Sequence, residues 1–130
     1  MYTSEIIQKV WEKGIIEEGY SAELIRKDAC GAWMVRSQYG NINSPFGWEI
    51  DHIYPRSKLE KLGVSEELID SMVNLRPMQH DNNLSKSDSY PSYLISKTAK
   101  GEVNVDADEV YTVNEKIQQQ IKKAYDDFQL

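Results

Sequence analysis

The chain has 130 residues, 40% of them hydrophobic and 28% charged, which is the size and composition of one globular domain. Its 15 basic and 21 acidic residues give a net charge of −6, which argues against tight nonspecific binding to nucleic acid. No apolar run reaches the roughly 18–20 residues of a membrane-spanning helix, so we expect no membrane partner. The single cysteine, Cys30, excludes an internal disulfide and a four-cysteine zinc site, and it favours a cytoplasmic location.

Charge is distributed unevenly along the chain. Residues 1–50 carry 5 basic and 7 acidic side chains, residues 51–100 carry 7 of each, and residues 101–130 carry 3 and 7. The middle of the chain is therefore the least acidic, and a site for an anionic substrate is expected there.

The first part of the chain predicts a helical lead-in over residues 1–47. Apolar residues recur at helical spacing after Thr3 or Ser4, either of which can cap a helix. Residues 21–28 predict a short second helix capped by Ser21. Residues 30–35 are apolar and predict a strand or a tight turn, while residues 39–47 are rich in Gly, Asn, Ser and Pro, which is typical of a loop.

A strand is predicted from residue 48 to residue 53, because side-chain character alternates there. Pro55 ends this strand, since proline lacks the amide donor of a ladder. Residues 56–73 form a long connection with a small helix from Ser65 to Ser71. Residues 75–78 predict a second extended run, and a helix is predicted to begin near His80 or Asp81.

The remaining residues, 89–130, predict an extension that ends in a helix. The valines at 103, 105, 110 and 113 indicate a hairpin around residues 106–108. Asp106 and Asp108 resemble half of a calcium loop, but no Gly and Glu follow at the required offsets, so we interpret them as turn residues. Asn114 is expected to cap a final helix over residues 115–128.

Two groups of residues are candidates for chemistry. Asp51 and His52 adjoin near the end of the predicted strand, where a carboxylate could hold a cation and an imidazole could accept a proton near neutral pH. Asn83 lies on the predicted helix with Lys86 three residues later, and its amide oxygen suits Mg²⁺ or Mn²⁺. Each residue also has an ordinary interpretation as a surface pair, a turn or a helix start. The prediction therefore depends on the joint pattern.

That joint pattern resembles the HNH endonuclease family. The matching residues are Trp48 to Ser57, then Val73 to Met78, then Asp81 to Asp88. Residues 48–88 contain the Asp-His-Ile-x-Pro-x-Ser run, the Asn-Leu pair and the closing Asn with Lys three residues later. The segment from Arg26 to Trp33 is similar to the lead-in of small stand-alone members.

The resemblance implies an α+β fold, with a ββα-metal core at 48–88 flanked by N-terminal and C-terminal helices in a single domain of residues 1–130. It implies that His52 is the general base and that Asn74 braces the loop and positions this histidine. It also implies that Asp51 and Asn83 hold one divalent metal, Mg²⁺ or Mn²⁺. This is an H-N-N variant, because His80 does not fall on the final motif position.

The resemblance further implies hydrolysis of phosphodiester bonds in DNA, with products that carry 5′-phosphate and 3′-hydroxyl groups. The candidate phosphate contacts are Arg56, Lys58, Arg76 and Lys86. Each of these residues can also be interpreted as a solvated surface charge. No Cys-x-x-Cys pairs are present, so no structural zinc is expected.

The acidic net charge keeps an alternative open, namely a catalytically inactive module that binds nucleic acid or protein. An enzyme that acts on RNA is a third hypothesis, because the motif does not distinguish an RNA substrate from a DNA substrate. The sequence is also compatible with a protein partner or a homodimer.

Overall fold

The computed structural model describes residues 1–130 as a mixed α+β fold with five α-helices and four two-stranded antiparallel sheets. The helices are α1 (Ser4–Trp11), α2 (Arg56–Lys61), α3 (Glu66–Ile69), α4 (His80–Lys86) and α5 (Glu115–Ala124). The strands are β1 (Ile25–Lys27), β2 (Trp33–Val35), β3 (Trp48–His52), β4 (Leu75–Gln79), β5 (Ser92–Leu94), β6 (Lys97–Lys100), β7 (Val103–Asp106) and β8 (Val110–Thr112). Short 3₁₀ turns are η1 (Arg36–Gln38), η2 (Met72–Asn74) and η3 (Asp126–Phe128). None of the helices has the length and apolar character that crossing a membrane requires.

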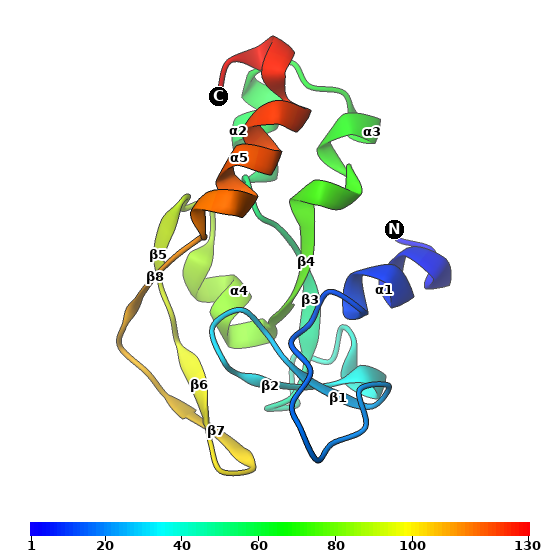
Figure 1. The fold of residues 1–130 in the computed structure, drawn as a ribbon, viewed down its shortest axis with the longest axis vertical. Coiled ribbons are helices and arrows are strands. Elements are labelled where there is room, and N and C mark those ends of the chain that lie inside the picture. Colours follow the sequence, from blue (N-terminus) through cyan, green and yellow to red (C-terminus); the bar gives the residue numbers. More distant parts are fainter.

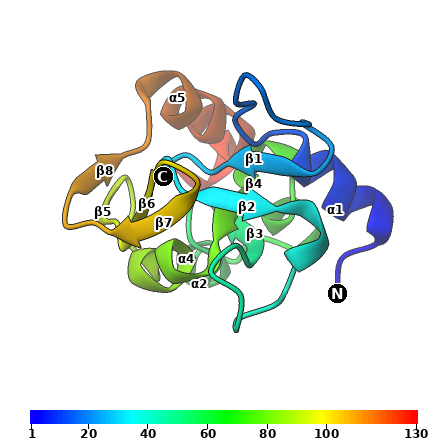
Figure 2. The same cartoon turned by 90° about the horizontal axis from the view of Figure 1, so that it is seen from below.

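The elements are arranged around the β3–β4 hairpin. Helices α2, α3 and α5 gather at one end of the molecule, and β1 and β2 lie at the other (Figure 1). The ribbon of β6 and β7 lies on the side opposite α1 in both views (Figure 1, Figure 2). The hairpin therefore has neighbours on both faces and at both ends.

The predicted helical lead-in is helical only in its first part. Helix α1 begins after Thr3, whose hydroxyl accepts a hydrogen bond from the amide of Ile6, as expected. The helix predicted over residues 21–28 does not form, because β1 pairs with β2 and Lys27 also exchanges two main-chain hydrogen bonds with Ile15. The side chain of Arg26 donates to three main-chain carbonyls of this region, which holds the extended form. A segment of eight residues has too little helical stability of its own to resist this pairing.

The central hairpin pairs β3 with β4 in the register Trp48↔Gln79 to His52↔Leu75. The long connection between these strands contains α2, α3 and η2, and Ser65 caps α3 as predicted. Helix α4 follows β4 without an intervening loop, and the side chain of Gln79 accepts a hydrogen bond from the amide of Asn82 at its start. The order strand, long connection, strand, helix therefore agrees with the predicted elements.

The C-terminal extension pairs differently from the prediction. The turn between β6 and β7 contains Gly101 at φ +62°, and β8 returns to pair with β5 rather than with β7. The predicted turn at 106–108 is the point where the chain leaves one ladder and enters the other. Helix α5 is capped by Asn114 as expected, and it ends at Ala124, four residues before the predicted end.

Two apolar clusters stabilise the fold. The larger joins the long connection, β4 and α5, and it contains Cys30, Ile53, Leu59, Val64, Ile69, Met78, Tyr93, Ile95, Val113, Ile121 and Tyr125. The smaller packs α1 against the hairpin, and it contains Val10, Trp11, Met34, Trp48 and Leu75. All three tryptophans are buried, in agreement with a core role and not with an exposed base-stacking surface.

Candidate active site

A polar cavity of about 480 Å³ lies where β3 ends, and it brings together four of the predicted site residues, Asp51, His52, Arg56 and Asn83. It is lined by Ile50, Asp51, His52, Pro55, Arg56, Ser57, Glu60, Asn83, Ser87 and Asp88. Strand β3 supplies the Asp-His pair, the start of α2 supplies Arg56, and α4 supplies Asn83. Neighbouring strand residues normally point to opposite faces, but at this strand end both Asp51 and His52 reach the same cavity.

The imidazole of His52 is oriented by a carboxylate. Its Nε2 lies 2.7 Å from Oδ1 of Asp70, and the side chain is 15% exposed. A carboxylate only accepts hydrogen bonds, so Nε2 carries the proton. In the neutral ring Nδ1 then holds the lone pair, and the structure gives this atom no hydrogen-bond partner. His52 is therefore in the tautomer of a proton acceptor.

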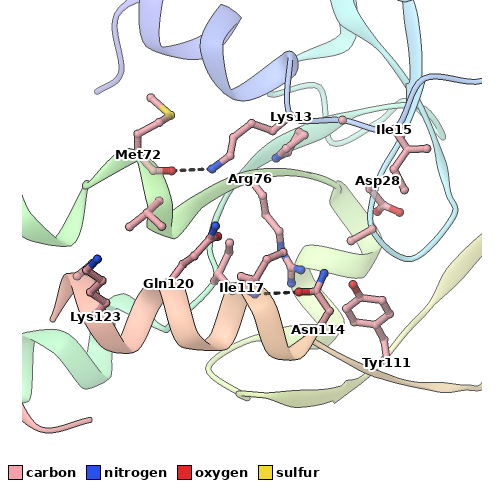
Figure 3. A pocket seen from close by; sticks show the side chains of 16 residues that line it. Lys13, Ile15, Asp28, Met72, Arg76, Tyr111, Asn114, Ile117, Gln120 and Lys123 are labelled. Carbon is pink, nitrogen blue, oxygen red and sulfur yellow. Dashed lines mark hydrogen bonds between the residues drawn. The ribbon is translucent and has the colours of Figure 1, made fainter. Parts of the chain in front are cut away.

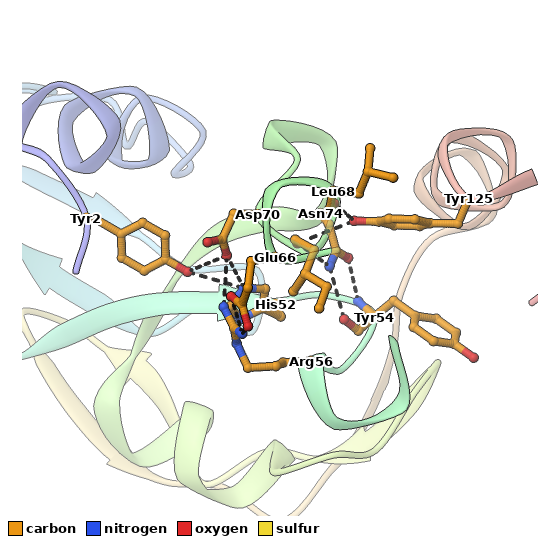
Figure 4. Close-up of polar contacts among 10 residues, drawn as sticks. Tyr2, His52, Tyr54, Arg56, Glu66, Leu68, Asp70, Asn74 and Tyr125 are labelled. Atoms are coloured by element: carbon orange, nitrogen blue, oxygen red, sulfur yellow. Dashed lines mark hydrogen bonds and ion pairs between the residues drawn. The ribbon is translucent and has the colours of Figure 1, made fainter. Parts of the chain in front are cut away.

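Asp70 collects several donors from distant parts of the chain (Figure 4). The hydroxyl of Tyr2 donates to Asp70 Oδ1 at 3.1 Å, and Arg56 Nη2 lies 3.3 Å from the same oxygen. Burial alone would raise the pKa of the Asp70 carboxyl, because it favours the protonated form. The hydrogen bonds from His52 and Tyr2 and the charge of Arg56 outweigh burial, so the pKa of this carboxyl lies below its ordinary value. Asp70 is thus an ionised partner for His52.

Neither Tyr2 nor Asp70 was among the residues predicted to form the site. Tyr2 lies 50 residues before His52, and Asp70 lies 18 residues after it in the long connection. The local sequence around each residue carries no spacing that points to the histidine. Only the folded arrangement of α1 and α3 beside the end of β3 brings them together.

Asp51 lies in a buried cluster of charges. Its Oδ2 accepts a hydrogen bond from Arg76 Nε at 2.9 Å, and its Oδ1 lies 3.3 Å from Lys86 Nζ. The side chains of Asp51, Arg76 and Lys86 are 4%, 7% and 0% exposed. Lys86 also donates to the carbonyl of His52, and burial lowers the pKa of its ammonium group. Two of the four cations predicted to contact phosphate, Arg76 and Lys86, therefore face inward, toward Asp51.

Asn83 presents an oxygen to the site. Its Nδ2 donates to Glu49 Oε1 at 3.0 Å, while its Oδ1 has no hydrogen-bond partner. The second histidine, His80, is held by the same Glu49 oxygen at 3.2 Å and does not line the cavity.

The residues of the cavity fit a hard divalent cation in their donor chemistry. Asp51 offers carboxylate oxygens and Asn83 offers an amide oxygen, which are the ligand types of Mg²⁺ and Mn²⁺. No group of three or more His, Cys, Asp or Glu side chains is arranged as a metal site, so most ligands of such an ion would be water. Arg76 and Lys86 oppose an additional positive charge beside Asp51.

Asn74 is fully buried, and its side chain makes no hydrogen bond to His52. Its Oδ1 accepts from the amide of Tyr54 at 2.7 Å, and its Nδ2 donates to the carbonyl of Tyr54 at 3.1 Å and of Ile69 at 3.4 Å (Figure 4). These bonds join the two ends of the long connection between β3 and β4. The side chain therefore fixes the backbone directly after the histidine.

Comparison of the chain with family models, with curated proteins and with solved structures finds no match. The chemistry of this site is therefore inferred from the arrangement of its own residues. It offers an oriented imidazole, a buried carboxylate and a free amide oxygen around one cavity.

Proposed function

We propose that this chain is an endonuclease with an HNH ββα-metal core that hydrolyses phosphodiester bonds in DNA. The observation that carries the proposal is the pairing of His52 with Asp70 beside Asp51 and Asn83. This pairing leaves Nδ1 of the histidine free to act as a base, and His52 lines the same cavity as the two oxygen donors. The β3–β4 hairpin with α4 directly behind it supports the proposed core.

In the proposed reaction His52 removes a proton from water, which attacks the phosphorus. The proton moves to Nδ1, and the ring becomes an imidazolium whose charge is stabilised by Asp70 2.7 Å from Nε2. The bond from phosphorus to the 3′-oxygen breaks, and the departing oxygen takes a proton from solvent water. The products are a 5′-phosphate and a 3′-hydroxyl. A divalent cation held by Asp51 and Asn83 would supply stabilisation of negative charge on the leaving oxygen.

Three of the four predicted phosphate contacts, Arg56, Arg76 and Lys86, receive different roles in this proposal. Arg76 and Lys86 fix the carboxylate of Asp51, because both are buried against it. Arg56 lines the cavity and is the remaining candidate for phosphate binding, although it is now paired with Glu66. Since the Glu66 side chain is 73% exposed and such pairs contribute about 0–1 kcal/mol, exchange of this partner for a phosphate costs little.

Cleavage of supercoiled plasmid tests the proposal. The purified protein is incubated with Mg²⁺ or Mn²⁺, with EDTA as a control, and matched single-stranded DNA and RNA are tested alongside. We expect metal-dependent nicking that falls at least ~100-fold in His52→Ala and to an intermediate level in Asp70→Asn. His80→Ala is the matched control, because this histidine lies outside the cavity and should retain activity. Full activity of His52→Ala would refute the assignment of the base.

A catalytically inactive module that binds nucleic acid or protein is the second candidate. The engagement of Asp51 by Arg76 and Lys86 favours it, because both carboxylate oxygens already face cations. The net charge of −6 also weakens long-range attraction to DNA. Binding of DNA or a partner protein by the folded chain, with no cleavage of DNA or RNA in any metal, would establish this alternative.

A further inference from the structure

A second and larger cavity lies on the other side of Arg76. It has a volume of about 930 Å³ and shares no lining residue with the candidate active site. Its walls come from the segment after α1, from η2 and β4, and from one face of α5 (Figure 3). Ile53, Met72, Val73 and Ile117 give it apolar walls. The volume lies within the roughly 300–1,000 Å³ of small-molecule sites.

Arg76 gives this cavity an unused hydrogen-bond donor. The residue is 6% exposed, its Nε donates to Asp51, and its Nη2 donates to the hydroxyl of Tyr93. Its Nη1 is the single buried side-chain nitrogen or oxygen in the structure without a hydrogen-bond partner. Buried donors in folded proteins are nearly always paired, and an unpaired guanidinium N–H is especially unfavourable. Arg76 lines the cavity, so an acceptor there that reaches the guanidinium would satisfy this donor.

The charges around the cavity favour an anion. Lys13 and Lys123 line it together with Arg76. Lys13 directs its ammonium to the carbonyls of Met72 and Leu75, whereas Lys123 has no ion pair. The one acidic residue in the lining is Asp28.

The oxygens of Asp28 are already engaged within the fold. Its carboxylate accepts four hydrogen bonds, from the amides of Cys30, Ala32 and Gln79 and from the side chain of Asn82. The cavity therefore combines apolar walls with two lysines, Lys13 and Lys123, that form no ion pair.

We propose that this cavity binds a small organic anion with an apolar body, whose carboxylate or phosphate group accepts a hydrogen bond from Arg76 Nη1. The apolar body lies against Ile53, Met72, Val73 and Ile117, and Lys123 lies at the rim. This site does not depend on the proposed nuclease activity, because the two cavities have separate linings.

Titration of the isotope-labelled full chain with matched probes tests this inference. Octanoate and 1-naphthyl phosphate represent the two head groups, and 1-octanol and 1-naphthol are their neutral counterparts. We expect at least one anion to bind at least tenfold more tightly than its neutral counterpart. Amide shifts should concentrate in α5 and η2. Binding of octanoate alone or of 1-naphthyl phosphate alone would identify the preferred head group. Equal affinity for each anion and its neutral counterpart, or shifts confined to residues around His52, would overturn the proposal.

Substitutions on α5 avoid the folding defect that a change at the buried Arg76 would cause. Lys123→Glu should weaken anion binding at least fivefold, and Ala124→Trp should weaken it at least tenfold by filling the cavity. Lys122→Glu is the matched control, because it makes the same charge change one residue away, outside this cavity. Equal effects of Lys122→Glu and Lys123→Glu would show that overall charge, and not this site, attracts the anion.

Discussion

Replacement of Asn74 by alanine should destabilise the fold by about 3 kcal/mol, from the loss of three hydrogen bonds at about 1 kcal/mol each. The amide and carbonyl of Tyr54 lose their side-chain partner, whereas the carbonyl of Ile69 keeps a contact from the hydroxyl of Tyr125. Tyr54 is half-buried, so water can compensate part of the loss and the estimate lies within about 2–4 kcal/mol. For a chain of this length the melting temperature should fall by about 10 °C.

Urea and thermal unfolding followed by circular dichroism measure this change. Asn43→Ala is the matched control, because Asn43 is exposed and its side chain makes no hydrogen bond, so a change within about 0.5 kcal/mol is expected. A loss below about 0.5 kcal/mol in Asn74→Ala would refute the reasoning, because the three bonds would then contribute nothing net.

The conservative substitution Asn74→Asp separates the role of the donor from that of the acceptor. It keeps an oxygen for the amide of Tyr54 but directs a carboxylate at the carbonyls of Tyr54 and Ile69. We expect marked destabilisation at neutral pH. The pKa of the introduced carboxyl should be raised in the folded state, so stability recovers relative to the wild type as the pH falls and the protonated group donates again. Absence of this recovery would show that the donor is not needed.

The remaining predictions concern three other buried or paired groups. Lys86→Met should raise the affinity for Mg²⁺ or Mn²⁺ several-fold in calorimetric titration, because one of the two cations beside Asp51 is removed. A fall in this affinity would contradict the proposal that Asp51 binds the metal. Burial raises the pKa of Cys30 to about 12. An aromatic disulfide reagent at pH 8 should therefore label this thiol only as fast as the chain unfolds. Rapid labelling of the folded chain would contradict the burial of Cys30. The pKa of Asp70 is lower in the folded chain than in the unfolded chain, where it is near 4. The stability that Asp70 contributes is therefore fully present above about pH 4, and it is lost as the pH falls through the lower pKa of the folded chain. The difference in unfolding free energy between the wild type and Asp70→Asn should therefore shrink as the pH falls below about 4. A difference that stays the same in acid would disprove the pairing.

Local patterns were sufficient to predict the elements that hold the candidate site. Thr3, Ser65 and Asn114 cap helices because a short polar side chain can satisfy a free amide wherever a helix begins. The strand at 48–52 and the helix after residue 79 also follow from alternation and helical spacing in the sequence. These features depend on neighbours within a few residues, so a single sequence contains them.

The features that escaped prediction depend on distant partners. The segment around Arg26 is extended because β2 pairs with it and because Ile15 forms an isolated bridge to Lys27. Strand β8 pairs with β5 because the β6–β7 hairpin lies between them in the chain. Arg76 and Lys86 were predicted to contact phosphate or solvent. In the folded chain both side chains are buried against Asp51, which no local pattern in the sequence indicates. Tertiary contacts decided these cases against the local tendency.

Arg76 connects the two cavities through one rigid group. Its Nε donates to Asp51 in the candidate active site, and the same side chain lines the cavity on the other side. The guanidinium is planar, so a ligand that pulls on Nη1 also turns Nε relative to the carboxylate. Thermodynamic linkage then requires that any effect of an anion on cation affinity at Asp51 be matched by an equal effect of the cation on the anion.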